Sequence, residues 1–120
     1  MKRERILQNI SLTSILLLLV SCSKVPDCNL PETVHYNSHV ADLIEIHCFK
    51  CHAQDVYKEK ASRVKIFNYE TLREMGESGQ LMGSVTHKTG YIAMPYKRES
   101  KIDSCTIELL KKWVETGMQK

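Results

Sequence analysis

The motif Cys48-Phe-Lys-Cys51-His52 constrains the fold of this chain more than any other feature of its sequence. A C-x-x-C-H motif is typical of a covalent attachment site for a c-type haem. Two thiols three residues apart on a helical turn can form thioethers with the two vinyl groups of one porphyrin, and the adjacent imidazole is then held beneath the iron. The spacing therefore predicts one covalent haem c per chain, bound through Cys48 and Cys51, with His52 as the proximal iron ligand.

Two other kinds of site also use closely spaced cysteines. A thioredoxin-like redox motif is expected next to a βαβ pattern, whereas the segments on either side of this motif have helical patterns. A structural zinc site needs a second pair of ligands at close spacing, and Cys28 and Cys105 lie far apart in the sequence. The residues favour haem, and the redox and zinc interpretations stay open as alternatives.

The N-terminus has the features of an export signal. Three basic residues precede an apolar segment from Ile6 to Val20. This segment is short for a spanning helix, which needs about 20 apolar residues, but suits the apolar region of a signal peptide.

The end of this segment, Leu19-Val20-Ser21-Cys22, resembles the lipobox of bacterial lipoprotein precursors. In those precursors the cysteine receives a diacylglyceryl group and becomes the first residue after cleavage. The resemblance implies a signal peptide over residues 1–21, lipidation at Cys22, and a protein anchored by lipid to a bacterial membrane, on its periplasmic side or at the cell surface. An ordinary secretory signal with an incidental cysteine is the alternative.

Residues 22–35 contain two prolines and no helical periodicity, which predicts a lipid-anchored tether before a domain that spans residues 36–120. Once Cys22 and the motif cysteines are assigned, Cys28 and Cys105 remain, and an oxidising compartment favours a disulfide between them over two free thiols. The free tether would then be the six residues from Cys22 to Cys28, which span at most about 20 Å. Such a tether would hold the domain close to the bilayer.

Charge and composition exclude some partners. Without residues 1–21 the formal net charge falls from +3 to +1, so a nucleic-acid partner is poorly supported. With 42% hydrophobic residues and little net charge, the chain is expected to fold rather than to stay disordered.

The periodicity of apolar residues predicts an all-α domain. Residues 38–51 form an amphipathic pattern with Ser38 as its N-cap, and residues 53–67 are predicted to be an irregular loop. Asn68 is the predicted N-cap of a second helix, residues 80–86 a short helical turn, and Asp103 the N-cap of a last helix that ends before Gly117.

The tripeptide Ala93-Met94-Pro95 offers a second iron ligand. A thioether is a soft ligand that raises the reduction potential of a haem iron. Pro95 restricts Met94 to extended conformations and stiffens the loop that presents the sulfur. Met94 is therefore the predicted distal ligand, and His87 in the same segment is its rival.

The order of these features resembles a small class I c-type cytochrome: an amphipathic helix, C-x-x-C-H, a capped middle helix, a Met-Pro loop, and a last helix with Trp-x-x-x-Gly. It is most similar to the short lipoprotein cytochromes of bacteria, which carry segments like 81–87 and 90–95, and the similarity covers residues 36–117. It implies a class I cytochrome c-like fold, with small helices wrapped around one covalently bound haem. Two departures are a proximal loop rich in Lys and Arg and a chain that ends soon after Gly117.

With both axial positions filled by protein, the expected function is one-electron transfer rather than catalysis. The chain is thus predicted to be a membrane-anchored monohaem cytochrome that exchanges electrons with extracytoplasmic redox partner proteins, membrane-bound ones included. One alternative is an accessory haem subunit of a larger membrane complex. Another is a gas-sensing or peroxidatic haem protein, if Met94 dissociates from the iron.

Overall fold

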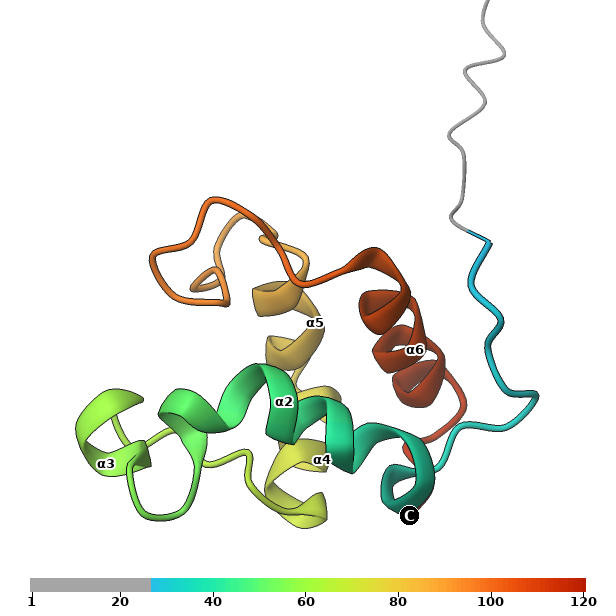
Figure 1. The fold of residues 1–120 in the computed structure, drawn as a ribbon, viewed down its shortest axis with the longest axis horizontal. Coiled ribbons are helices and arrows are strands. Elements are labelled where there is room, and N and C mark those ends of the chain that lie inside the picture. The colour runs from blue at the N-terminus through green and yellow to red at the C-terminus, as the bar shows by residue number, and fades with distance from the viewer. Residues whose placement is uncertain (1–26) are drawn as a thin grey trace, which may run out of the picture.

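The computed structural model describes residues 27–120 of the chain. This part contains six helical segments, joined by loops, and no strand (Figure 1). In chain order they are η1 (Tyr36–Val40, a π-helical turn), α2 (Ala41–His52), α3 (Tyr57–Lys60), α4 (Tyr69–Glu77), α5 (Gln80–Val85) and α6 (Ser104–Glu115). The prediction of an all-α domain is confirmed for these residues. The predicted signal peptide and Cys22 lie outside them. Within the same range, no helix has both the length and the apolar character needed to cross a bilayer.

The predicted caps of α4 and α6 are confirmed. The Asn68 side chain accepts a hydrogen bond of 3.0 Å from the backbone N–H of Thr71, and Asp103 accepts one of 2.9 Å from that of Thr106. Each cap satisfies a backbone donor that the first helical turn leaves without a partner. Gly117, just beyond α6, has a φ of +92°, a left-handed conformation that ends the helix where the sequence predicted.

The predicted N-cap at Ser38 is wrong, because the helical path begins earlier, at Tyr36. The backbone N–H of His35 donates to Nδ1 of His39 at 3.1 Å, and that of Tyr36 donates to the carbonyl of Gln119 at 2.9 Å. The second of these contacts holds the start of the helix against a residue near the C-terminal end of the chain. Local periodicity in the sequence does not reveal such a contact. The segment expected to be irregular also differs, since α3 forms within it and buries Tyr57.

The core lies where the first helix meets the last. Trp113 of α6 is fully buried, with the rings of Tyr36 and Tyr69 centred 6.2 Å and 6.5 Å away. Its indole N–H donates to the carbonyl of Gln119 at 2.9 Å, so the ring is buried without an unsatisfied donor. These contacts hold the start of the helical domain, at Tyr36, against its C-terminal end. Tyr69, the first residue of α4, packs against the same ring.

The last part of the predicted tether is attached to α6. Cys28 and Cys105 form a disulfide with their Cα atoms 5.4 Å apart. The carbonyl of Pro31 accepts a hydrogen bond of 2.6 Å from Lys112, and Val34 is fully buried. The chain is therefore held against the domain from Cys28 onward.

We expect Asp103→Ala to lower the free energy of unfolding by about 1 kcal/mol near neutral pH, because it removes the cap of α6. Hydrogen bonds from the hydroxyl and N–H of Thr106 hold the pKa of Asp103 below its usual value. A carboxylate with a lowered folded pKa stabilises the native state above its unfolded pKa, and this contribution disappears as the pH falls through the folded pKa.

Denaturant unfolding of wild type and variant, at neutral pH and in acid below the usual carboxyl pKa, measures this contribution. The difference between the two proteins should shrink in acid. Asp103→Asn, which keeps a capping oxygen without a charge, is the control and should lose less stability. A difference between wild type and Asp103→Ala that stays constant down to low pH would contradict the assignment.

Candidate haem site

The last turn of α2 carries all three residues of the predicted attachment motif. Cys48, Cys51 and His52 have the i, i+3 and i+4 spacing that places side chains on one face of a helix. Neither motif cysteine forms a disulfide, since the disulfide joins Cys28 to Cys105. Both motif thiols are half-buried and free to form other bonds.

His52 is buried, with 8% of its surface exposed, and its ring orientation is fixed by the backbone. Nδ1 lies 3.1 Å from the carbonyl oxygen of Val64. Because a carbonyl can only accept, Nδ1 must carry the proton and donate. In the tautomer that this contact selects, the free electron pair is on Nε2, the arrangement found in metal-binding histidines whose other nitrogen donates to a carbonyl. The backbone thus orients His52, with Nε2 left as the acceptor nitrogen of the ring.

The Val64 carbonyl is a functional group that the sequence analysis missed. Every residue carries such a carbonyl, so no residue type marks it. Its place follows from the left-handed turn at Ser62 and Arg63, with φ of +49° and +67°, which leads the chain back from α3 toward α2.

Burial raises the pKa of the Cys48 thiol to about 11. The cause is desolvation, which disfavours the thiolate relative to the neutral thiol. At neutral pH Cys48 is therefore a protonated thiol of low reactivity toward electrophiles, since the thiolate is the nucleophile.

In the haem-free chain, we expect iodoacetamide to modify Cys48 slowly at neutral pH and faster as the pH rises toward about 11. Peptide mapping by mass spectrometry, over a range of pH, measures the rate at this residue. The urea-unfolded chain is the control, because there Cys48 should react with an ordinary thiol pKa of about 8.5. Equal pH profiles in the folded and unfolded chains would show that burial has no effect on this thiol.

Met94 lies in the segment between α5 and α6, here named the Met94 loop (residues 88–101), and its side chain is half-buried. The backbone N–H of Met94 donates to the carbonyl of Ser84 at 3.0 Å. Its carbonyl accepts a hydrogen bond of 3.0 Å from Nε2 of His87. The backbone of Met94 is therefore held on both sides by residues in or just after α5.

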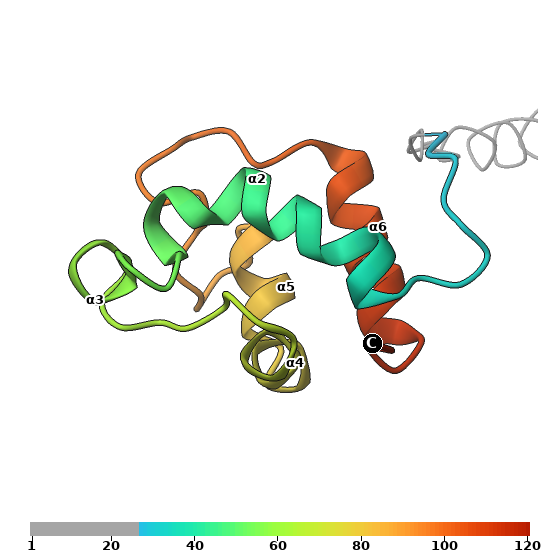
Figure 2. The same ribbon diagram turned by 60° about the horizontal axis from the view of Figure 1, so that its bottom comes forward.

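These contacts give His87, the rival iron ligand, a different part in the site. Its Nε2 is occupied by the Met94 carbonyl, so in this structure it positions the loop. Tyr91 anchors the start of the same loop, because a Cβ on Gly83 of α5 would overlap the Tyr91 ring. Only glycine at position 83 lets the ring lie so close to the helix. In both ribbon views the Met94 loop lies on the side of the molecule where α2 ends (Figures 1 and 2).

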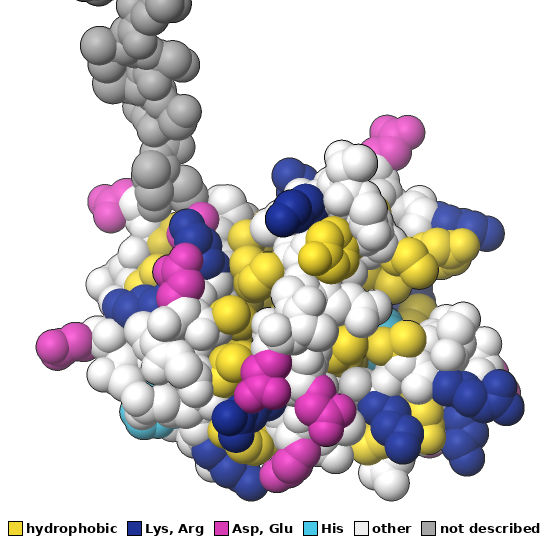
Figure 3. Space-filling view, turned by 180° about the vertical axis from the view of Figure 1, so that it is seen from behind, with side chains coloured by type: hydrophobic (Ala, Val, Ile, Leu, Met, Phe, Trp, Pro, Cys, Tyr) yellow, Lys and Arg dark blue, Asp and Glu magenta, His cyan; other side chains and the backbone are white. Residues whose placement is uncertain are grey.

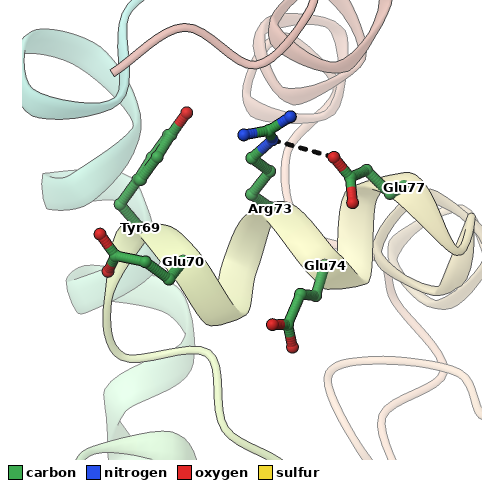
Figure 4. Close-up of a pocket in the computed structure, with 5 residues that line it drawn as sticks. All are labelled: Tyr69, Glu70, Arg73, Glu74 and Glu77. Carbon is green, nitrogen blue, oxygen red and sulfur yellow. Dashed lines mark ion pairs between the residues drawn. The ribbon is translucent and has the colours of Figure 1, made fainter.

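Two cavities open on either side of α4, and neither is lined by the motif residues or Met94. The first, of about 290 Å³, lies on the outer face of the helix, where Arg73 pairs with Glu77 at 2.9 Å (Figure 4). The second, of about 390 Å³, lies between α4 and the segment that contains Val64. Its lining residues are Arg63, Val64, Lys65, Thr71, Glu74, Met75, Ser78 and Gln80.

Within residues 27–120, no group of three or more His, Cys, Asp or Glu side chains is arranged to hold a metal ion. A haem iron does not need such a group, because the porphyrin supplies four nitrogen ligands and the protein one or two. Two free thiols next to one oriented imidazole have the chemistry that covalent haem attachment uses. Comparison of the chain with models of protein families, with curated proteins and with solved structures finds no match.

Proposed function

We propose that the protein is a membrane-anchored monohaem c-type cytochrome, with a class I-like fold, that carries single electrons between redox partners outside the cytoplasm. The observation that carries this proposal is the last turn of α2. It presents two free thiols beside a buried imidazole whose Nδ1–H is bound to the Val64 carbonyl. This is the donor set that covalent haem attachment and axial ligation require.

Each residue has a separate part in this function. Cys48 and Cys51 would hold the porphyrin by thioether bonds, which keeps the cofactor on the protein through repeated turnover. His52 would bind the iron through Nε2, and its bond to Val64 fixes the ring and increases its strength as a donor. When bound, the haem supplies one-electron exchange between ferric and ferrous iron.

Met94 would be the second axial ligand. Its backbone is fixed by Ser84 and His87, so the sulfur would be presented by a loop that is already ordered. An iron held by both His52 and Met94 would have no position open to a substrate, which favours a carrier over an enzyme. The lipid at Cys22 would keep this carrier at a bacterial membrane.

Visible spectra of the purified mature protein, oxidised and reduced, test the proposal, with carbon monoxide added to the reduced form. We expect the bands of a six-coordinate c-type haem, one haem per chain, and no change on addition of carbon monoxide. A large shift with carbon monoxide would instead support a gas-sensing or peroxidatic haem protein in which Met94 leaves the iron. A colourless protein would refute both.

A further inference from the structure

The Met94 loop exposes an unusual concentration of large apolar side chains. Four such side chains are exposed in residues 27–120, and three of them lie between positions 91 and 96. In the chain without haem, Ile92 is 62% exposed and Tyr96 64%, with Tyr91 beside them at 37%. The fourth is Ile46 on α2. Clustered exposed apolar side chains mark a surface that contacts a membrane or another protein.

Basic side chains accompany this apolar cluster. The same loop carries four exposed cationic residues, Lys88, Lys97, Arg98 and Lys101, against one acidic residue, Glu99. Asp103 follows just after it, and its carboxylate is engaged in capping α6. Seen from behind, apolar side chains lie next to Lys and Arg side chains over this part of the molecule (Figure 3). Apolar and tyrosine side chains mixed with cations suit the interface of an anionic bilayer.

The disulfide joins the segment that follows the free tether to the end of α6 at which this loop finishes. Cys105 is four residues after Lys101, and the disulfide holds Cys28 at the same end of α6. In both ribbon views the Met94 loop runs along the upper edge of the molecule toward α6, and residues 27–30 lie at the other end of that edge, beyond α6 (Figures 1 and 2). Six residues from Cys22 to Cys28 span at most about 20 Å, so this edge cannot move far from the bilayer.

We infer that the Met94 loop is a membrane-docking surface, with its cations on anionic lipid headgroups and Ile92 and Tyr96 in the interfacial layer. The inference rests on the lipid anchor at Cys22 that belongs to the proposed function. The tether limits the distance of the domain from the membrane, and the loop sets its orientation. A membrane surface is favoured over an acidic protein because the short tether keeps this edge beside lipid at all times.

The test uses the mature chain, residues 22–120 with haem, in which Cys22→Ser removes the lipid. Cosedimentation with vesicles of phosphatidylglycerol and phosphatidylcholine measures its affinity, with pure phosphatidylcholine vesicles as the neutral comparison. We expect binding to the anionic vesicles that weakens with salt. The triple variant Lys97→Gln, Arg98→Gln, Lys101→Gln should bind about 100-fold more weakly, since each basic side chain near the surface contributes about fivefold.

The matched control is Lys58→Gln, Lys60→Gln, Lys65→Gln, which removes the same charge from exposed positions outside the loop and should change affinity less than threefold. A second variant, Ile92→Ser with Tyr96→Ser, keeps every charge and should weaken binding at all salt concentrations.

Two results would overturn the inference. The first is an absence of binding to anionic vesicles. If the loop variant then loses affinity for an acidic redox protein, that loss would assign the loop to a protein partner instead of a membrane. The other is an equal loss of affinity in the two triple variants. The absorbance of the same samples reports the haem, so a failure of the proposed function would be seen separately.

Discussion

Replacement of both Cys48 and Cys51 by serine is expected to abolish covalent haem attachment. The two thiols are the only groups of the motif that can form thioethers, and the structure leaves both outside the disulfide. His52 could still bind iron, but a haem held by axial ligands alone is extracted by acidified acetone. The variant and the wild type are each produced with a haem-ligation apparatus and then extracted. The wild type should keep all of its haem, and the variant should keep none.

The other cysteine pair provides a matched control. Cys28→Ser with Cys105→Ser also removes two cysteines and should keep the full amount of covalent haem. This variant should lose stability instead, because a disulfide that closes a loop of 77 residues stabilises by about 4 kcal/mol in the loop-entropy account. Denaturant unfolding measures that loss. Retention of extraction-resistant haem by the Cys48 and Cys51 variant would refute the attachment site.

Replacement of Met94 by leucine is expected to remove one axial ligand while leaving the haem attached. Leucine has a similar volume and no sulfur, so the loop should keep its packing. The ferric protein should lose the far-red absorption that arises from sulfur-to-iron charge transfer. The reduction potential should fall by on the order of 0.1 V, a part of the about 0.8 V range that axial ligands span.

Met75→Leu is the control, since Met75 is a half-buried methionine that packs against the core rather than a predicted ligand. It should leave both the far-red band and the potential unchanged. Spectra and a redox titration of the two variants decide the assignment. If Met94→Leu keeps the band, Met94 does not bind the iron, and His87 becomes the residue to substitute next.

Local signals in the sequence predicted the N-caps of α4 and α6, because each depends on residues three positions apart, but the N-cap predicted at Ser38 was wrong. Asn68 and Asp103 cap the helices that follow them through Thr71 and Thr106, and Gly117 ends α6. The all-α class followed from the same kind of pattern. These features need no knowledge of the rest of the fold.

Local sequence patterns could not predict the contacts between segments that are distant in the sequence. The first helix begins at Tyr36 rather than Ser38 because its backbone pairs with Gln119, a residue at the other end of the chain. The Val64 carbonyl, which orients His52, is a backbone group that no residue type marks. The bond from His87 to Met94 likewise depends on the path of a loop. The sequence therefore offered candidate residues for the site, which stay a prediction, but it did not reveal the groups that hold His52 and Met94 in place.

Intact-mass measurement of the mature chain tests the central claim most directly. The chain is produced with a working haem-ligation apparatus, purified, denatured and weighed. The account predicts that every molecule carries the added mass of one haem and that the mass stays after denaturation, since Cys48 and Cys51 bind the porphyrin covalently. A denatured chain with no added haem mass would contradict the account.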